Sequence, residues 1–216
     1  VLLSVIAGMY AVYHGPKGIF QIAKTIHENT KVLASSLKEN GYEIRHDQFF
    51  DTIRFGTNGK NINFENLKIN VRSYEGGDIG VSIDETTSED DIKKLLQIFE
   101  CNEVTNNFFA LKENRSTEYL THEVFNSYHS ETEMMRYLKK LETKDLSLNT
   151  SMISLGSCTM KLNAAAEMMP ISWPEFSSIH PFAPESQTLG YQKLFKSLES
   201  WLVNILSLIH ISEPTR

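Results

Sequence analysis

The sequence predicts an α/β fold, and three patterns within residues 17–105 indicate it. Apolar residues recur every three or four positions across 17–40, which is the spacing of one face of a helix. Between 42 and 83 the chain changes to short runs in which apolar and polar residues alternate, as they do in half-buried strands. From Ser88 onward the helical spacing returns, so a helix, several strands and a second helix are expected in that order.

Turn and capping residues set the ends of these elements. His-Gly-Pro at 14–16 precedes the first helix, and Gly41 follows its last apolar turn, where glycine tolerates the left-handed backbone. Glu-Gly-Gly-Asp at 75–78 predicts a hairpin turn. Ser88 caps the next helix, whose first turn carries three acidic residues that suit the positive end of the helix dipole. The predicted strands are 42–46, 52–55, 67–74 and 79–83.

A second group of elements follows a polar stretch at 106–116. Ser130 and Glu133 have the spacing of a capping box, which predicts a helix that continues to about residue 142. The chain is then expected to be extended over 144–159. A third helix is expected over 185–205, with four leucines facing inward: Leu189, Leu194, Leu198 and Leu202.

Composition excludes several classes of protein. The net charge of -6 and the absence of a basic cluster interleaved with aromatic residues argue against a nucleic-acid partner. No run of 18 apolar residues exists, so no membrane span is expected. The two cysteines, Cys101 and Cys158, are too few for a secreted disulfide scaffold and predict reduced thiols inside a cell.

The candidate chemistry lies in the irregular stretch 151–191. Gly-Ser-Cys-Thr at 156–159 offers backbone amides and the side chains of Ser157, Cys158 and Thr159, which could cradle an anion or form an ordinary turn. Lys161 could bind phosphate or form an imine, although most lysines do neither, and Cys158 could be a nucleophile or a buried thiol. His180 precedes a proline and must be extended, which could aim its ring into a cleft or leave it in an ordinary loop.

Metal and dinucleotide sites are not predicted. His122 and His129 are seven residues apart, but no HExxH or CxxC accompanies them. The glycines at 76–80 lie between strands and precede no helix, unlike those of a dinucleotide-binding loop.

Ordered motifs make the chain resemble glycine dehydrogenase (decarboxylating), the P-protein family of the glycine cleavage system. The first motifs are Met-Tyr-Ala-Val-Tyr-His-Gly-Pro-Lys-Gly at 9–18 and His-Asp-Gln-Phe-Phe-Asp-Thr at 46–52. Arg-Ser-Thr-Glu-Tyr-Leu-Thr-His-Glu-Val-Phe-Asn at 115–126 and Leu-Gly-Ser-Cys-Thr-Met-Lys-Leu-Asn at 155–163 follow in family order. The remaining matches are at 129–134, 179–184 and 190–192.

The resemblance implies a fragment of a type I fold of pyridoxal-phosphate (PLP) dependent transferases. Residues 1–105 would be the C-terminal small domain of the first half of such a protein, and 106–118 a linker. Residues 119–205 would begin the second, catalytic half, whereas 206–216 depart from the family and predict a non-native tail. The lysine that forms the Schiff base with PLP is not expected in this chain, because Lys161 does not match its position.

The same resemblance implies an activity. With PLP as cofactor, the family decarboxylates glycine and transfers the aminomethyl group to the lipoyl arm of the H-protein. The expected pocket residues are Thr159, Lys161, Asn163 and His180, with Ser157 and Cys158 near the cofactor. Self-association as a dimer or as paired halves is expected, in a bacterial cytoplasm or a mitochondrial matrix, while the chain alone should be inactive. The alternatives are a non-catalytic module that dimerises or docks a lipoyl carrier, and a general type I transaminase.

Overall fold

The computed structural model describes residues 1–57, 59, 62, 64, 69–104, 109, 115–144, 152 and 164–206. The chain divides into two compact units, Val1–Ile153 and Ser154–Arg216, and each is considered by itself. The N-terminal unit contains α1 (Leu2–Glu39), β1 (Glu43–Ile44), β2 (Thr52–Gly56), β3 (Arg72–Ser73), β4 (Asp78–Ser82), α2 (Glu89–Ile98), η2 (Glu123–Asn126) and α3 (Glu131–Glu142). The C-terminal unit contains α4 (Ala165–Met168), η4 (Met169–Ser172), α5 (Pro174–Ser177), η5 (Glu185–Gln187) and α6 (Leu189–Leu206).

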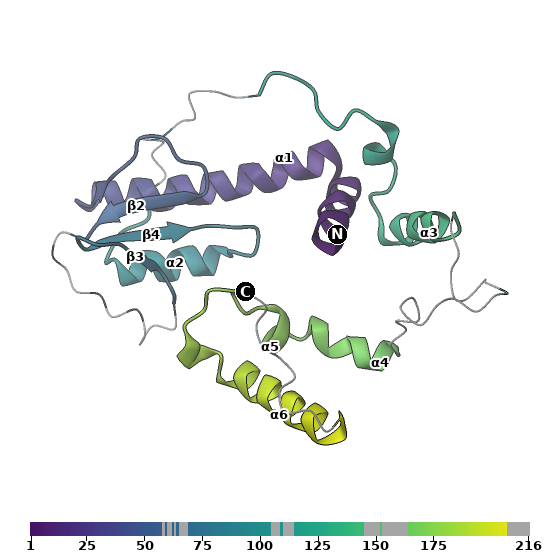
Figure 1. The fold of residues 1–216 in the computed structure, drawn as a ribbon. Coiled ribbons are helices and arrows are strands. Elements are labelled where there is room, and N and C mark those ends of the chain that lie inside the picture. Colours follow the sequence, from purple (N-terminus) through teal and green to yellow (C-terminus); the bar gives the residue numbers. More distant parts are fainter. Residues whose placement is uncertain are drawn as a thin grey trace. The chain divides into compact units, whose positions relative to one another are not determined.

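The strands form one antiparallel sheet in the order β1-β2-β4-β3 (Figure 1). Ile53 of β2 lies opposite Val81 of β4, and Phe55 lies opposite Ile79. Since side chains alternate along a strand, these four residues share one face of the sheet, and all four are buried. The alternation predicted for these two strands is therefore confirmed. Among the described residues of the strand predicted at 67–74, Arg72 and Ser73 pair with β4, whereas 69–71 and 74 lie outside the strand.

Helices α1 and α2 cover the apolar face of the sheet. Leu33 and Leu37 of α1 and Leu96 of α2 belong to the same buried cluster as the four strand residues. Phe99, which ends α2, is also buried there, and its carbonyl oxygen accepts a hydrogen bond of 3.0 Å from the hydroxyl of Tyr42. This mixture of helices and a small antiparallel sheet confirms the α/β class in its general sense.

The hairpin predicted at 75–78 joins β3 to β4. The amide of Tyr74 donates to the carbonyl of Asp78 over 2.9 Å, and the amide of Gly77 donates back to Tyr74 over 3.2 Å. Gly76 and Gly77 have φ values of 94° and 88°, a region that side-chain-bearing residues rarely adopt. The two glycines therefore permit the turn.

Helix α1 bends sharply at Gly15, which has φ 59° and ψ -178° (Figure 1). Pro16 follows it and cannot donate a helical hydrogen bond, so the helix start predicted at 14–16 is instead a bend within a longer helix that begins at Leu2. Before the bend, most apolar side chains of α1 are exposed: Leu2, Leu3, Val5, Ile6, Tyr10 and Tyr13.

The predicted N-cap at Ser88 and the predicted capping box at Ser130 are both confirmed, and the structure shows that Ser88 also forms a capping box. The Ser88 hydroxyl accepts from the amide of Asp91 over 3.2 Å, and the Ser130 hydroxyl accepts from the amide of Glu133 over 3.3 Å. In each box the acidic side chain bonds back to the amide of its serine. The box at Ser130 begins α3 where the sequence predicts it.

The third predicted helix needs two corrections. The short η5 precedes it, so α6 begins at Leu189 rather than at 185. The prediction that the leucines of this helix face inward is also wrong within this unit. Leu189, Leu194 and Leu198 are 65%, 46% and 48% exposed. None of the described residues in 164–206 is buried, because the short elements of this unit leave one whole face of α6 uncovered. The extended stretch predicted at 144–159 lies almost entirely outside the described residues.

Candidate functional site

Most of the predicted site residues lie outside the part of the chain that the structure describes. These are Ser157, Cys158, Thr159, Lys161 and Asn163. Their proposed roles therefore stay predictions from sequence. Of the predicted set, His180 is the residue whose geometry is described.

His180 sits in a tight turn that fixes the hydrogen-bonding state of its ring. The Phe182 amide donates to Nδ1 of His180 over 3.0 Å, and the Ala183 amide donates to the His180 carbonyl over 2.9 Å. A neutral imidazole that accepts at Nδ1 carries its proton on Nε2. The exposed ring can therefore donate a hydrogen bond from Nε2 to an anionic group.

Ile179, the residue directly before His180, lines a mainly apolar hollow. It has a volume of about 470 Å³, and α5 and α6 supply most of its lining. The Tyr191 hydroxyl donates to the Phe176 carbonyl over 2.7 Å, which ties α6 to the end of α5. Apolar parts of Phe176, Leu194 and Trp201 also line the hollow. Such a surface suits an apolar partner better than a small charged substrate.

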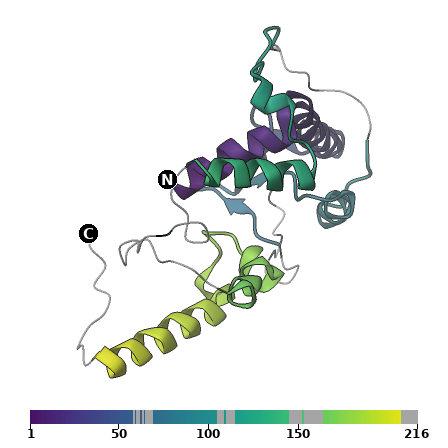
Figure 2. The same ribbon diagram turned by 90° about the vertical axis from the view of Figure 1, so that its right-hand side faces the viewer.

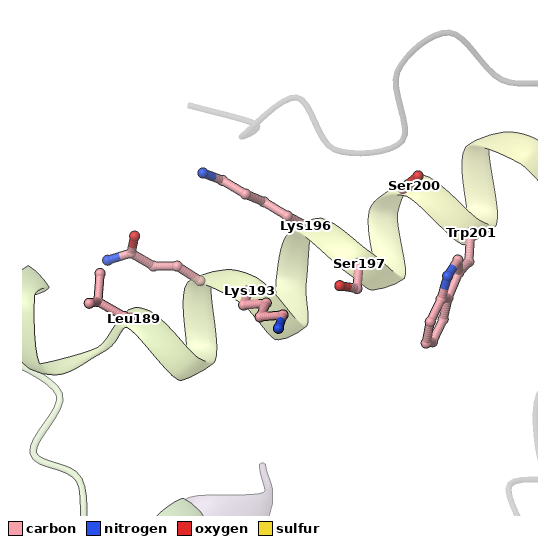
Figure 3. A pocket seen from close by; sticks show the side chains of 7 residues that line it. Leu189, Lys193, Lys196, Ser197, Ser200 and Trp201 are labelled. Atoms are coloured by element: carbon pink, nitrogen blue, oxygen red, sulfur yellow. The ribbon is translucent and has the colours of Figure 1, made fainter.

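A second hollow of about 500 Å³ follows one side of α6 (Figure 3). All of its lining residues come from that helix, and Lys196 and Trp201 leave it in opposite directions. Because a single helix cannot surround a ligand, this open surface is not a catalytic pocket.

The sheet carries a charged cluster on the face opposite its core. The carboxylate of Asp78 accepts hydrogen bonds from two guanidinium groups, at 2.8 Å from Arg45 Nη2 and 2.8 Å from Arg54 Nε. Arg45 also reaches Glu43, with Nη1 2.7 Å from its carboxylate. These contacts join β2 and β4 to the chain that follows β1. The Asp78 side chain is only 7% exposed, whereas both arginines are partly open to solvent.

Hydrogen bonds from Arg45, and then from Arg54, hold the pKa of the Asp78 carboxyl below its ordinary value. The same contacts raise the pKa of Arg45 further, so both partners stay charged. A carboxylate that two arginines keep ionised is a poor general base. The cluster therefore serves the sheet rather than catalysis.

This cluster predicts a loss of stability in acid. Because the folded-state pKa of Asp78 is depressed, its contribution is present above the unfolded pKa, roughly 4, and disappears as the pH falls from there toward the folded value. Urea midpoints of the normal chain should therefore fall between pH 5 and pH 3 by more than those of the Asp78→Asn variant.

Asp90 is the matched control for that experiment. Its carboxylate is 81% exposed and lies 3.8 Å from Lys93 on α2. Asp90→Asn should keep the normal dependence on pH, since exposed pairs contribute little. Equal pH dependence in the normal chain and the Asp78→Asn variant would contradict the assignment.

The structure adds residues that the sequence reasoning did not single out. The aromatic side chains that line the hollow are among them, although Phe176 and Tyr191 stand within the irregular stretch 151–191. Asp78 is the other: the sequence places it in the turn at 75–78, whereas the structure makes it the first residue of β4. Among the described residues, no group of three or more histidines, cysteines or acids is placed to bind a metal. No helix in the described ranges is both long and apolar enough to cross a membrane.

Comparison with known proteins identifies the family. Residues 1–99 match the family model of the glycine cleavage system P-protein. A glycine dehydrogenase (decarboxylating) of Nostoc punctiforme is 50% identical over 98% of this chain and 24% of its own length. The corresponding protein of Thermosynechococcus vestitus is also 50% identical, over 98% of this chain and 23% of its own. The mitochondrial one of Gallus gallus is 47% identical, over 98% and 22%.

The resemblance predicted from the ordered motifs is therefore confirmed: residues 1–99 match the P-protein family model, and nearly the whole chain is similar to glycine dehydrogenases (decarboxylating). Its counterparts are the glycine dehydrogenases (decarboxylating) of bacteria and of a mitochondrion. The chain spans about a quarter of the length of these curated relatives.

Proposed function

We propose that this chain is part of an enzyme that decarboxylates glycine with PLP and passes the aminomethyl group to a lipoylated H-protein. The observation that carries the proposal is the identity of about half of the residues along nearly the whole chain to glycine dehydrogenases (decarboxylating). Since the chain spans about a quarter of those proteins, the complete activity belongs to a longer protein.

The proposed fold is that of the type I PLP-dependent transferases, in two halves. Residues 1–105 would end the first half, 106–118 would link the halves, and 119–205 would open the catalytic half. A location in the bacterial cytoplasm or the mitochondrial matrix agrees with the relatives, one of which is named mitochondrial.

We propose that the lysine that holds PLP is not among the described residues. An imine-forming lysine is activated by burial in an apolar pocket or by a neighbouring cation. No lysine among the described residues is buried. When bound, PLP supplies an electron sink for the charge left by decarboxylation. We propose that Ser157 and Cys158 contact the cofactor, and that Thr159, Lys161, Asn163 and His180 line the glycine pocket.

A test follows from the position of Lys161. In a chain extended to the length of its relatives, Lys161→Arg should keep the visible absorbance of lysine-bound PLP, because another lysine would hold the coenzyme. Release of labelled carbon dioxide from glycine should fall by about tenfold or more, since a misplaced pocket cation weakens substrate positioning. Loss of the absorbance in Lys161→Arg would make Lys161 the coenzyme lysine and overturn this assignment.

The 216-residue chain is the matched control for that test. It should show neither the absorbance nor carbon dioxide release. A second candidate function, a module that associates with another copy, is favoured by the exposed apolar wall of α6, where Trp201 is 62% exposed. If the extended chain binds no PLP and releases no carbon dioxide, yet sediments as a dimer, this second function replaces the first.

A further inference from the structure

Residues 119–129, far along the chain, pack against the bend in α1. Gly15 is buried, as is Val12 one turn before it, although the other residues of α1 before Thr30 are exposed or half-buried. Its backbone, with φ 59° and ψ -178°, lies in a region that is essentially restricted to glycine. Both ribbon views place η2 beside this bend (Figure 1, Figure 2).

The contact at Gly15 leaves no room for a side chain. A Cβ atom at this position would lie 2.6 Å from the carbonyl oxygen of Phe125 and 2.6 Å from Cε1 of His129. Real Cβ atoms essentially never approach other atoms so closely. Since the carbonyl is backbone, it cannot rotate away as a flexible side chain would.

Two hydrogen bonds flank the glycine. Nδ1 of His129 donates to the carbonyl of Tyr13 over 2.8 Å, and the hydroxyl of Tyr119 donates to the carbonyl of Pro16 over 2.7 Å. The acceptors lie on either side of Gly15 in the sequence, and the donors lie on either side of η2. Residues 116 and 103 positions apart are joined in this way.

We propose that the break at Gly15 is a docking notch for residues 119–129 of the same chain. The notch accepts a short turn that presents the backbone carbonyl of Phe125, with the phenol of Tyr119 before it and the imidazole of His129 after it. Because Ser130 caps α3 directly after His129, docking also fixes where α3 begins. This role concerns how the segment is held on α1 and is independent of the catalytic proposal.

Hydrogen exchange of the 216-residue chain tests the notch. The amides of Val124 and Phe125 bond within the docked segment, to Nδ1 and to the carbonyl of His122. In Gly15→Ala these two amides should exchange about tenfold faster or more, while those of Ile92–Leu96 in α2 keep their rates. Gly8→Ala is the matched control, because Gly8 lies in α1 with nothing within 4 Å of an added Cβ, and it should leave both sets unchanged.

A double variant decides the matter if Gly15→Ala speeds exchange in α2 as well. Tyr119→Phe with His129→Ala removes both flanking hydrogen bonds and adds no clash to α1. Faster exchange confined to Val124 and Phe125 would support the notch. Unchanged rates at these two amides, in Gly15→Ala or in the double variant, would overturn it.

Discussion

Replacing Phe55 by alanine should remove about 3–5 kcal/mol from the free energy of unfolding of the N-terminal unit. Phe55 is fully buried in the centre of β2. Its ring meets Phe99 edge-on with centroids 5.1 Å apart, and Tyr42 in the same manner at 5.8 Å. The variant loses both contacts and leaves a cavity that the paired strands cannot fill by collapsing. A domain is typically stable by only about 5–15 kcal/mol, so this loss is a large share.

Urea unfolding, followed by circular dichroism, measures this prediction, and Phe20 provides the control. Phe20 lies on α1 after the bend and is 62% exposed. Phe20→Ala should change the free energy of unfolding by about 0.5 kcal/mol or less, because exposed positions contribute little. Equal midpoints for Phe55→Ala and Phe20→Ala would show that the cluster around Phe55 is not the core of this unit.

The elements that sequence predicts correctly depend on chemistry between near neighbours. The two capping boxes each need only a serine and an acid three residues later. The hairpin needs glycines where φ is positive, and the strands need alternation on one buried face. All of these signals can be read within a window of ten residues, which explains why they hold.

The elements that sequence misjudges depend on distant partners. The leucine spacing of α6 correctly predicts a helix, but burial of that face requires a second surface, which the described residues of its unit do not provide. The cluster at Asp78 joins residues 24 and 33 positions away, so no local pattern announces it. Pro16 predicts the bend in α1, whereas the residues that close on Gly15 could not be inferred from it.

The candidate site divides in the same way. The turn at His180 follows from the proline after it, because residues before proline avoid the helical region. Whether Thr159, Lys161 and Asn163 approach that histidine depends on tertiary packing, and their proximity stays a prediction. Substitution of His180 is therefore the most direct test of whether the described turn takes part in the proposed reaction.

In a chain extended to the length of its relatives, His180→Asn should lower glycine decarboxylation by about a hundredfold. The amide of Phe182 donates to Nδ1 of His180, so a neutral ring carries its proton on Nε2. In the proposed pocket this N–H would face the carboxylate of glycine. The amide group of asparagine can replace Nδ1 as the acceptor, which preserves the turn, but it cannot reach the place of Nε2. The variant thus separates a donor to the substrate from a residue that only shapes the loop.

Release of labelled carbon dioxide measures this effect, and two variants complete the test. His180→Gln carries a donor closer to the position of Nε2 and should recover part of the lost rate. His27→Asn is the matched control. The Nδ1 atom of His27 also contacts the backbone, 2.9 Å from the carbonyl oxygen of Phe50, but His27 lies in α1, outside the proposed pocket. Normal turnover in His180→Asn would remove His180 from the pocket, and an equal loss in His27→Asn would mean that the effect comes from folding rather than from contact with glycine.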